Sequence, residues 1–284
     1  MQIFKTRHQL IPYLIKLKEE GNSIGFIPTM GALHKGHLSL INRCNSENSI
    51  SVCSIFVNPT QFTDTNDLAK YPRPIQEDII KLESAECDIL YLPEADDIYP
   101  DGTKKTEDFD FSGLENKLEG VSRPGHFAGV AQVVKVLLEI MQPDKLYLGQ
   151  KDYQQFLILY KLVEILKFPT EVVMCPIFRE QNGLAMSSRN ERLNVDLRKK
   201  AGIINATLNY SATILNEFSI DEIKHIAITF LNSNDDFIVD YFEILNAENL
   251  ENISPNATPE KTIIIVSVIV GGVRLLDNLI INNN

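Results

Sequence analysis

Two histidines, His34 and His37, stand three residues apart shortly after a buried apolar run at residues 23–28. In the first turn of a helix, residues with this spacing lie on one face, so both rings would point the same way. A helix N-terminus also presents N–H groups and a partial positive charge, which together bind anions. Gly31 and Gly36, beside the pair, would let a ligand approach the backbone closely. Because the same field disfavours imidazolium, we expect two neutral N–H donors to phosphate oxygens.

Two cationic side chains in other polar segments could meet the same kind of ligand. Lys151 follows an apolar run, and Arg189 follows the paired serines Ser187 and Ser188. A lysine offers a point charge to a phosphate, whereas an arginine offers a planar fork of donors. Helix capping would explain part of both patterns, but it explains neither Lys151 nor the doubled serines. We therefore treat these residues as candidates for an anion site.

The elements that must position these side chains are strands alternating with helices. Runs that are apolar throughout, separated by helical spacing, are typical of a parallel sheet covered on both faces. In such sheets ligands bind outside the carboxyl ends of the strands, and each polar segment above follows a predicted strand. No G-x-G-x-x-G follows the first strand, so the usual dinucleotide fingerprint is absent. The predicted strands are residues 23–28, 50–57, 88–92, 145–148 and 170–175, and the predicted helices are residues 9–21, 34–45, 74–85, 124–141 and 152–166.

The pattern changes after about residue 182, which indicates a second, smaller α+β domain. Two helical stretches, at 196–216 and 220–231, precede strands at 237–245 and 262–270. Residues 100–120 are polar and aperiodic and are expected to form a long loop. The predicted fold is α/β, with a Rossmann-like parallel-sheet domain at residues 1–178 and a smaller α+β domain at residues 179–284.

Composition limits the possible partners. The 284 residues carry 27 Lys and Arg against 38 Asp and Glu, a formal net charge of -11. This balance excludes a general nucleic-acid or anionic-membrane binder, so any polyanion must be held at a small, focused site. The four cysteines form no C-x-x-C pair and are expected to be buried, reduced thiols. The N-terminus lacks the apolar core of a signal peptide and the longest apolar stretch is too short to span a bilayer, so we expect a cytoplasmic protein.

Taken together, the motifs resemble those of the pantoate–β-alanine ligase family over essentially the whole chain. The histidine pair alone is shared by the wider HxGH nucleotidyltransferase superfamily, which includes class I aminoacyl-tRNA synthetases. Each motif alone is modest, whereas all of them in order are a strong signal. The matching segments are PTMGALHKGH (28–37), FVNPTQF (56–62), YPR (71–73), SRPGHF (122–127), GQKDYQQ (149–155), MSSRN (186–190) and RLLDN (274–278).

The resemblance implies a two-step ligation driven by ATP. Pantoate attacks ATP to give pantoyl adenylate and pyrophosphate, with Mg²⁺ neutralising the phosphates; β-alanine then displaces AMP to form pantothenate. It further implies a cytoplasmic homodimer whose first domain binds nucleotide and pantoate and whose second domain closes the cleft. His37, His34 and Lys151 would be the catalytic residues. His37 occupies the position usually named as a proton donor, although we favour hydrogen-bonding stabilisation by His37 over literal acid catalysis.

The resemblance also assigns binding residues. Gln61 and Gln155 would hold pantoate, with Asn58 assisting near the pyrophosphate, and Glu77 and Asp78 would reach Mg²⁺ through water. The residues implied around ATP are Met30, Gly31, Ala32, Leu33, His34, Lys35, Gly36, His37, Gly149, Gln150, Lys151, Asp152, Phe178, Met186, Ser187, Ser188 and Arg189.

Three positions depart from the family pattern. Gln150 stands where the family commonly has glutamate, and Lys35 replaces a commonly acidic residue. Phe178 stands where a small aliphatic residue usually lies against adenine, which would alter the shape of that pocket. Since every phosphate-facing residue is present, we expect an active enzyme.

Other functions remain open at this point. A nucleotidyltransferase acting on a phosphate-bearing substrate would use the same histidines but would not require Gln61 and Gln155. A catalytically silent nucleotide-binding protein is disfavoured by Lys151 and by the paired serines before Arg189. A tRNA ligase is disfavoured by the chain length, the acidic balance and the absence of an anticodon-binding extension.

Overall fold

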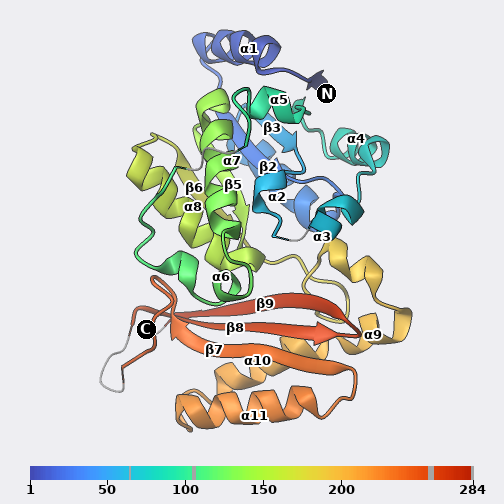
Figure 1. The fold of residues 1–284 in the computed structure, drawn as a ribbon, viewed down its shortest axis with the longest axis vertical. Helices are drawn as coiled ribbons and strands as arrows, with labels where there is room; N and C mark the ends of the chain where they lie inside the picture. Colours follow the sequence, from blue (N-terminus) through green and yellow to red (C-terminus); the bar gives the residue numbers. More distant parts are fainter. Residues whose placement is uncertain (64, 104–106, 255–258, 283–284) are drawn as a thin grey trace. The chain divides into compact units, whose positions relative to one another are not determined.

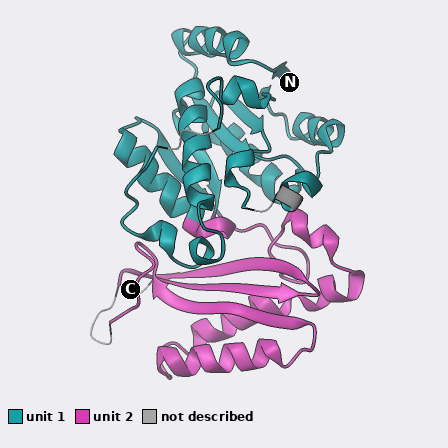
Figure 2. Ribbon diagram, in the orientation of Figure 1, with its two compact units in different colours: residues 1–149, 155–175 teal, residues 150–154, 176–284 magenta. Residues whose placement is uncertain are grey.

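The computed structural model describes residues 1–63, 65–103, 107–254 and 259–282. The chain divides into two compact units (Figure 2). The first comprises Met1–Gly149 and Gln155–Cys175, and the second comprises Gln150–Gln154 and Pro176–Asn284. The sequence-based boundary lay between residues 178 and 179; the short segment 150–154, which contains Lys151, packs with the second unit.

The first unit is built on a six-stranded, all-parallel sheet in the order β1-β4-β3-β2-β5-β6 (Figure 1). Its central strand, β2, pairs with β3 on one side and with β5 on the other, in registers that place Phe26 opposite both Val52 and Leu146. All three of these side chains are fully buried, as expected for a sheet with both faces covered. The predicted Rossmann-like α/β class is therefore confirmed. The strands are β1 (Gln2–Phe4), β2 (Ile24–Thr29), β3 (Ile50–Ile55), β4 (Ile89–Tyr91), β5 (Lys145–Gly149) and β6 (Glu171–Cys175).

The strand order reverses between β2 and β5. From β2 the chain adds β3 and β4 in one direction, and it then returns to place β5 and β6 on the other side of β2. In an open parallel sheet this reversal opens a crevice at the carboxyl ends of the two strands. Residues 30–37 follow β2 and residues 150–152 follow β5 in the chain.

Helices flank this sheet and pack closely on it. A Cβ atom at Gly25 on β2 would lie 2.3 Å from Cys44 Sγ on α2, so only glycine allows this helix to lie so near the strand. The core on this side contains Ile27, Ile41 and Leu82. The helices are α1 (Arg7–Glu19), α2 (Lys35–Glu47), α3 (Thr65–Lys70), α4 (Ile75–Ser84), α5 (Ala95–Ile98), α6 (Glu119–Ser122), α7 (His126–Met141) and α8 (Tyr153–Leu166), with 3₁₀ turns η1 (Pro59–Gln61) and η2 (Leu114–Asn116). The turn η3 (Gln150–Asp152) and the first two residues of α8 pack with the second unit.

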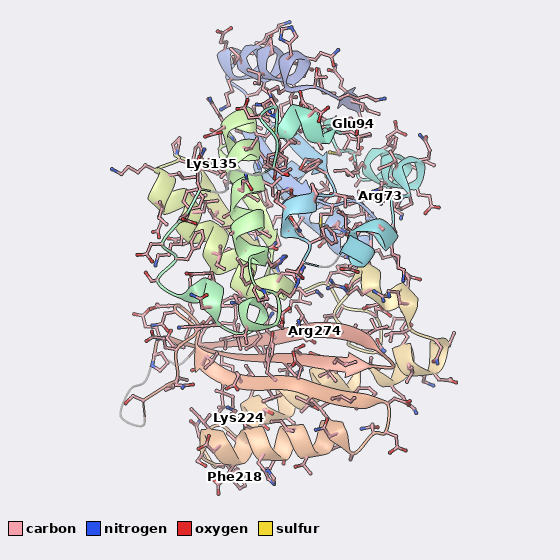
Figure 3. The ribbon with its side chains drawn as sticks, viewed as in Figure 1. Arg73, Glu94, Lys135, Phe218, Lys224 and Arg274 are labelled. Carbon is pink, nitrogen blue, oxygen red and sulfur yellow. The ribbon has the colours of Figure 1, made fainter. Side chains whose placement is uncertain are left out.

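The second unit is a three-stranded antiparallel sheet, in the order β7-β8-β9, with α10 and α11 contributing to one hydrophobic core with it. The predicted α+β class is confirmed. Figure 3 marks Lys224 on α11, whose ammonium pairs with Glu243 on β7 at 2.6 Å and so ties the helix to the sheet. The elements are η4 (Ser188–Arg192), α9 (Val195–Lys200), α10 (Ile203–Thr213), α11 (Ile220–Asn232), β7 (Phe237–Asn246), β8 (Lys261–Val270) and β9 (Val273–Asn282).

Several predicted elements differ from the structure. The single helix expected at 196–216 is two helices, α9 and α10, and Gly202 lies between them. A Cβ at Gly202 would come within 2.3 Å of the Asn182 carbonyl oxygen, so the connection between the two helices packs tightly against a segment distant in sequence. Strand β9 was not predicted because buried Asp277 and Asn278 interrupt its apolar pattern. The three-residue edge strand β1 was also missed, since so short a run carries no periodicity.

The segment expected to be a long loop, residues 100–120, contains η2 and the start of α6; residues 104–106 lie outside the described part of the chain. Across the described residues, no helix is both long enough and apolar enough to cross a membrane.

Candidate active site

The histidine pair lies where the sequence predicts, at the N-terminus of α2. His34 is the N-cap residue and has extended backbone angles, and His37 is the third residue of the helix. The backbone N–H of His34 donates to Nδ1 of His37 at 3.2 Å, and the N–H of His37 donates to the carbonyl oxygen of His34 at 2.8 Å. The two ring centroids are 4.0 Å apart. The pair is thus one unit at the helix end, as expected from the spacing.

This hydrogen bond determines which nitrogen of His37 carries the proton. A neutral imidazole has one donor nitrogen and one acceptor nitrogen. Because Nδ1 accepts from the His34 N–H, the proton resides on Nε2 in the neutral ring. The imidazolium form, with both nitrogens protonated, would lose this cap. The geometry therefore agrees with the expectation of a neutral N–H donor.

Asp78 on α4 holds the loop that carries the pair. Its two carboxylate oxygens accept hydrogen bonds from the N–H groups of Ala32, at 2.8 Å, and Leu33, at 2.7 Å. The loop needs this support because Gly31 and Ala32 both adopt positive φ, at 79° and 48°. Lys81 Nζ donates to the Leu33 carbonyl oxygen at 2.8 Å. The loop before His34 is therefore fixed by side chains of α4.

The Asp78 carboxylate is fully buried, and burial raises its pKa despite the two backbone hydrogen bonds and Lys81. Both oxygens are engaged by the loop, whereas the neighbouring Glu77 side chain is 72 % exposed and lies 4.0 Å from Lys81. No group of three or more His, Cys, Asp or Glu side chains is arranged to hold a metal ion in the described part of the chain. These residues do not fit a magnesium site that the protein builds by itself.

Asn58 and Gln61 form a buried polar network after β3. Asn58 is 1 % exposed, and its Nδ2 donates to Gln61 Oε1 at 3.0 Å and to the Gly129 carbonyl oxygen at 3.1 Å. Its Oδ1 accepts from the Tyr99 hydroxyl at 2.8 Å. Gln61 Nε2 contacts Met30 Sδ at 3.1 Å. Because the Asn58 amide is used within the protein, the geometry gives it the role of orienting Gln61.

Helix α7 supports the same turn through its first residues. His126 Nδ1 lies 2.8 Å from the backbone oxygen of Gln61, and both residues are buried. A Cβ at Gly129 would lie 2.3 Å from the Thr60 carbonyl oxygen and 2.7 Å from the Gln61 nitrogen. The glycine therefore allows α7 to lie against η1, which fixes the position of Gln61.

Lys151 lies in the turn η3, directly after β5, and packs with the second unit. Its ammonium is 3.3 Å from Asp152 Oδ1, and its side chain is only 16 % exposed. Asn278 on β9 donates from Nδ2 to the carbonyl oxygens of Gln150 and Lys151, both at 3.0 Å. Gln150 Nε2 donates in return to Asn278 Oδ1 at 3.0 Å. The Gln150 side chain is therefore occupied in holding the turn.

The segment around Arg189 belongs to the second unit as well. Ser187 caps η4, and its Oγ accepts from the Arg189 N–H at 3.3 Å. The Met186 N–H donates to the carbonyl oxygen of Phe178 at 2.9 Å, and the Phe178 side chain is 40 % exposed. Met186, Ser187, Ser188 and Arg189 are all partly exposed. This backbone hydrogen bond places Phe178 beside Met186, the residue that precedes the two serines.

The predicted residues thus fall into two groups, one in each unit. The structure brings together the histidine pair, the Asn58–Gln61 network and Asp78 in the first unit. Gln155, on the part of α8 that belongs to the first unit, is half-buried, and Lys35 is exposed at the start of α2. The residues of the second unit are Gln150, Lys151, Asp152, Phe178, Met186, Ser187, Ser188 and Arg189.

Nucleophilic catalysis by cysteine finds no support. All four cysteines are free and buried, as the sequence predicts. Burial raises the pKa of Cys44 to about 12 and that of Cys87 to about 11, so these thiols stay protonated near neutral pH.

Four supporting residues were not identified from sequence in the roles that they have here: Asp78, His126, Gly129 and Asn278. His126 and Asn278 lie in the segments SRPGHF and RLLDN, so the motifs marked them without indicating a role. Asp78 was assigned to metal binding. No local pattern marks Gly129, whose contact lies 69 residues away in sequence.

Known proteins of one family match this chain over nearly its whole length. The family model described as pantoate-beta-alanine ligase matches residues 2–280. The chain is 41% identical over 284 residues to a pantothenate synthetase of Christiangramia forsetii, covering 100% of both chains. It is 42% identical over 275 residues to a pantothenate synthetase of Cytophaga hutchinsonii, covering 96% of each.

Solved structures agree with these matches. The fold is similar to that of pantothenate synthetase from Thermus thermophilus, with a TM-score of 0.88 and 37% identity over 98% of this chain and 99% of that chain. It is also similar to a pantoate-beta-alanine ligase from Francisella tularensis solved with "Beta-gamma ATP" and β-alanine. There the TM-score is 0.79, with 36% identity over 98% of this chain and 97% of that chain.

Proposed function

The chain belongs to the pantoate-beta-alanine ligase family, and from this premise we propose that it makes pantothenate from pantoate, β-alanine and ATP in two steps. The observation that carries the proposal is the histidine pair at the N-terminus of α2, beside the reversal of strand order, in a chain that matches the family from residue 2 to residue 280. Pantoate, β-alanine and ATP are the small-molecule substrates.

In the first step a carboxylate oxygen of pantoate attacks the α-phosphorus of ATP. The bond from that phosphorus to the bridging oxygen breaks, which gives pantoyl adenylate and releases pyrophosphate. In the second step the β-alanine amine attacks the acyl carbon, the bond to AMP breaks, and the amine loses a proton as the amide forms. Activation is needed because a carboxylate has no leaving group that an amine can displace, whereas AMP leaves readily.

Protein groups contribute positioning and electrostatic stabilisation to this chemistry. The first turn of α2, with His34 and His37, donates hydrogen bonds to phosphate oxygens through N–H groups. We assign positive charge for the ATP phosphates to two residues of the second unit, Lys151 in η3 and Arg189 in η4, with Ser187 and Ser188 preceding Arg189 in the chain. The remaining ATP contacts are those assigned above from the resemblance.

Pantoate is held by Gln61 and Gln155. Gln61 is well suited to orient a small hydroxy acid, because Asn58, Met30 and His126 fix its amide and its backbone. Asn58 acts through Gln61, since its own amide groups are engaged by the protein. This pairing of a phosphate site with a rigid amide favours a small acid as the co-substrate.

We propose that Mg²⁺ enters bound to the ATP phosphates, whose charge it neutralises. Magnesium keeps several waters and is commonly bound through substrate phosphates with one or two carboxylates. Glu77, which is exposed, could contact such an ion through water, whereas Asp78 serves the loop instead. No step is assigned to a magnesium ion held by the protein alone.

The test is an assay with ATP, pantoate, β-alanine and Mg²⁺ that follows AMP, pyrophosphate and pantothenate together. We expect AMP release that depends on both acids and matches pantothenate in amount. Absence of β-alanine-dependent AMP release would overturn the proposal, and transfer of a nucleotide to a phosphate-bearing acceptor would favour the competing nucleotidyltransferase. We further propose a cytoplasmic homodimer, which sedimentation at micromolar protein concentration would test.

A further inference from the structure

The turn that carries Lys151 is held by a buried side chain distant in sequence, that of Asn278. Asn278 is fully buried, and its amide makes three hydrogen bonds to the turn, to the carbonyl oxygens of Gln150 and Lys151 and from the Gln150 side chain. Both hydrogens of its Nδ2 are thereby used. The two carbonyl groups that they bind, that of Gln150 before Lys151 and that of Lys151 itself, are held in place.

Asn278 is itself held rigidly. It lies on β9 opposite Ile265 of β8, so the ladder fixes its backbone position. Its N–H donates to Asp277 Oδ1 at 2.8 Å. Asp277 is 2 % exposed and accepts a two-bond fork from Arg179, at 2.7 and 2.9 Å. The chain of support therefore runs from the sheet and Arg179 through Asp277 and Asn278 to the turn.

These contacts explain why a buried polar pair interrupts an otherwise apolar strand. A buried amide is costly unless its hydrogen bonds are made, and here two are made to backbone carbonyls of the turn and one is accepted from the Gln150 side chain. An apolar residue at position 278 would remove the donors of two carbonyl oxygens in a partly buried turn. The segment RLLDN, whose motif had no assigned role, thus fixes the backbone of a charged residue.

We infer that Asn278 is a positioning residue for the ligation. By fixing the backbone of the turn, it holds the Lys151 ammonium where it can contact the phosphates of ATP. The inference rests on the proposed function, in which Lys151 binds those phosphates. A lysine side chain has four rotatable bonds, so a fixed backbone restricts the volume that its ammonium can occupy. Loss of this restriction weakens a charge contact without removing the charge.

The test is a double-mutant cycle in which kcat/KM for ATP is measured on the full chain. Asn278→Asp keeps the size of the side chain and the acceptor for Gln150, but it replaces both donors by an oxygen facing the two carbonyls. We expect Lys151→Ala to lower kcat/KM by at least ~10²-fold, as loss of one preorganised charge contact can. We expect Asn278→Asp alone to lower it by about tenfold or more, and to change it by less than about threefold in the Lys151→Ala background.

A structural role without positioning would give a different pattern. If Asn278→Asp lowers kcat/KM by the same factor in both backgrounds, or leaves the wild-type value unchanged, the inference is wrong. Ile244→Ala, which removes buried apolar volume from β7 of the same sheet without touching the turn, is the control and is expected to lower the unfolding temperature but not kcat/KM. An equal loss in this control would also overturn the inference.

Two further measurements separate a failure to fold, and a failure of the proposed ligation, from a failure of the inference about Asn278. If Asn278→Asp does not fold, Asn278→Ser repeats the cycle with a neutral side chain that can serve only one carbonyl. The wild-type assay for β-alanine-dependent AMP release is done first, because its failure refutes the proposed ligation, whereas additivity in the cycle refutes only the role of Asn278.

Discussion

At the scale of single residues, the hydrogen bond that His37 accepts is the feature with the clearest consequence for mechanism. Its Nδ1 accepts from the His34 N–H at 3.2 Å, which leaves the proton on Nε2. The ring can therefore donate a hydrogen bond to a phosphate oxygen without first gaining a proton. This arrangement favours stabilisation of the transition state over proton transfer to pyrophosphate.

His37→Ala is expected to lower the rate of pyrophosphate release by about 10²-fold with little change in the unfolding temperature. In the wild-type enzyme, that rate should stay level from neutral to moderately alkaline pH, because the neutral ring already carries the donor N–H on Nε2. Single-turnover pyrophosphate release measured across this range checks the expectation. A rate that falls steadily with rising pH and becomes flat in His37→Ala would instead identify an imidazolium acid.

Asp78→Asn tests the clamp on the loop before the pair. The substitution replaces one acceptor oxygen by an NH₂ group that faces a backbone N–H, so the buried N–H of Ala32 or Leu33 loses its partner. We expect the free energy of unfolding to fall by about 1–3 kcal/mol and KM for ATP to rise. Glu83→Gln, at an exposed position later on α4, is the matched control for charge. Urea unfolding and ATP titration of both variants measure these two effects. If Asp78 contacted magnesium instead, its substitution would alter the Mg²⁺ concentration that the reaction requires, which a Mg²⁺ titration would show.

At the scale of elements, the close approach of α7 to η1 positions Gln61. Gly129→Ala would raise helix propensity by about 1 kcal/mol, yet its Cβ would lie 2.3 Å from the Thr60 oxygen. The helix and the turn must then separate. We expect lower stability and a higher KM for pantoate, with KM for ATP little changed.

The control for this substitution is Lys135→Ala, later on the same helix, where the ammonium pairs with Glu107 and Glu139 (Figure 3). Thermal unfolding and steady-state kinetics of both variants provide the comparison. An unchanged KM for pantoate in Gly129→Ala would show that this contact does not position Gln61.

The C-terminal end of α2 is tied to β5 by Glu47, which gives a pH dependence of known sign. Its carboxylate accepts from Arg43 at 2.9 Å, from Tyr147 at 2.9 Å and from Lys145 at 3.1 Å. The bond to Arg43 is the largest of the causes that lower the pKa of Glu47, from 4.5 to about 2. A lowered pKa means that the folded state favours the ionised form, so this stabilisation is present above pH 4.5 and is lost as the pH falls towards 2.

We therefore expect wild type to unfold at a higher temperature than Glu47→Gln at pH 7, and this difference to shrink as the pH falls below 4.5. Unfolding curves at pH 7, 4.5 and 3 measure it. Glu164→Gln, on the exposed face of α8, should show no such trend. A difference that is independent of pH would mean that Glu47 stabilises only through packing.

At the scale of the whole molecule, the net charge of -11 constrains which polyanions can bind. A protein of this charge repels an extended polyanion, whereas the single triphosphate of the proposed function requires only a small, focused site. Duplex DNA at physiological salt is therefore not expected to compete with ATP, and AMP release should be the same with and without it. Inhibition by DNA that weakens with added salt would reveal a basic surface that the charge sum conceals.

Local sequence determined most of the fold and marked the candidate residues of the site. Five parallel strands, the helix after His34 and the polar strand ends follow from periodicity and spacing, because burial and backbone geometry repeat over a few residues. The supporting contacts were not accessible in this way. Asp78 reaches Ala32 across 46 residues, Gly129 meets Thr60 across 69, and Asn278 holds Lys151 across 127. The sequence thus predicts which groups act on the ligand, whereas the tertiary structure decides which groups hold those side chains in place, since such contacts depend on the packing of elements distant in the chain.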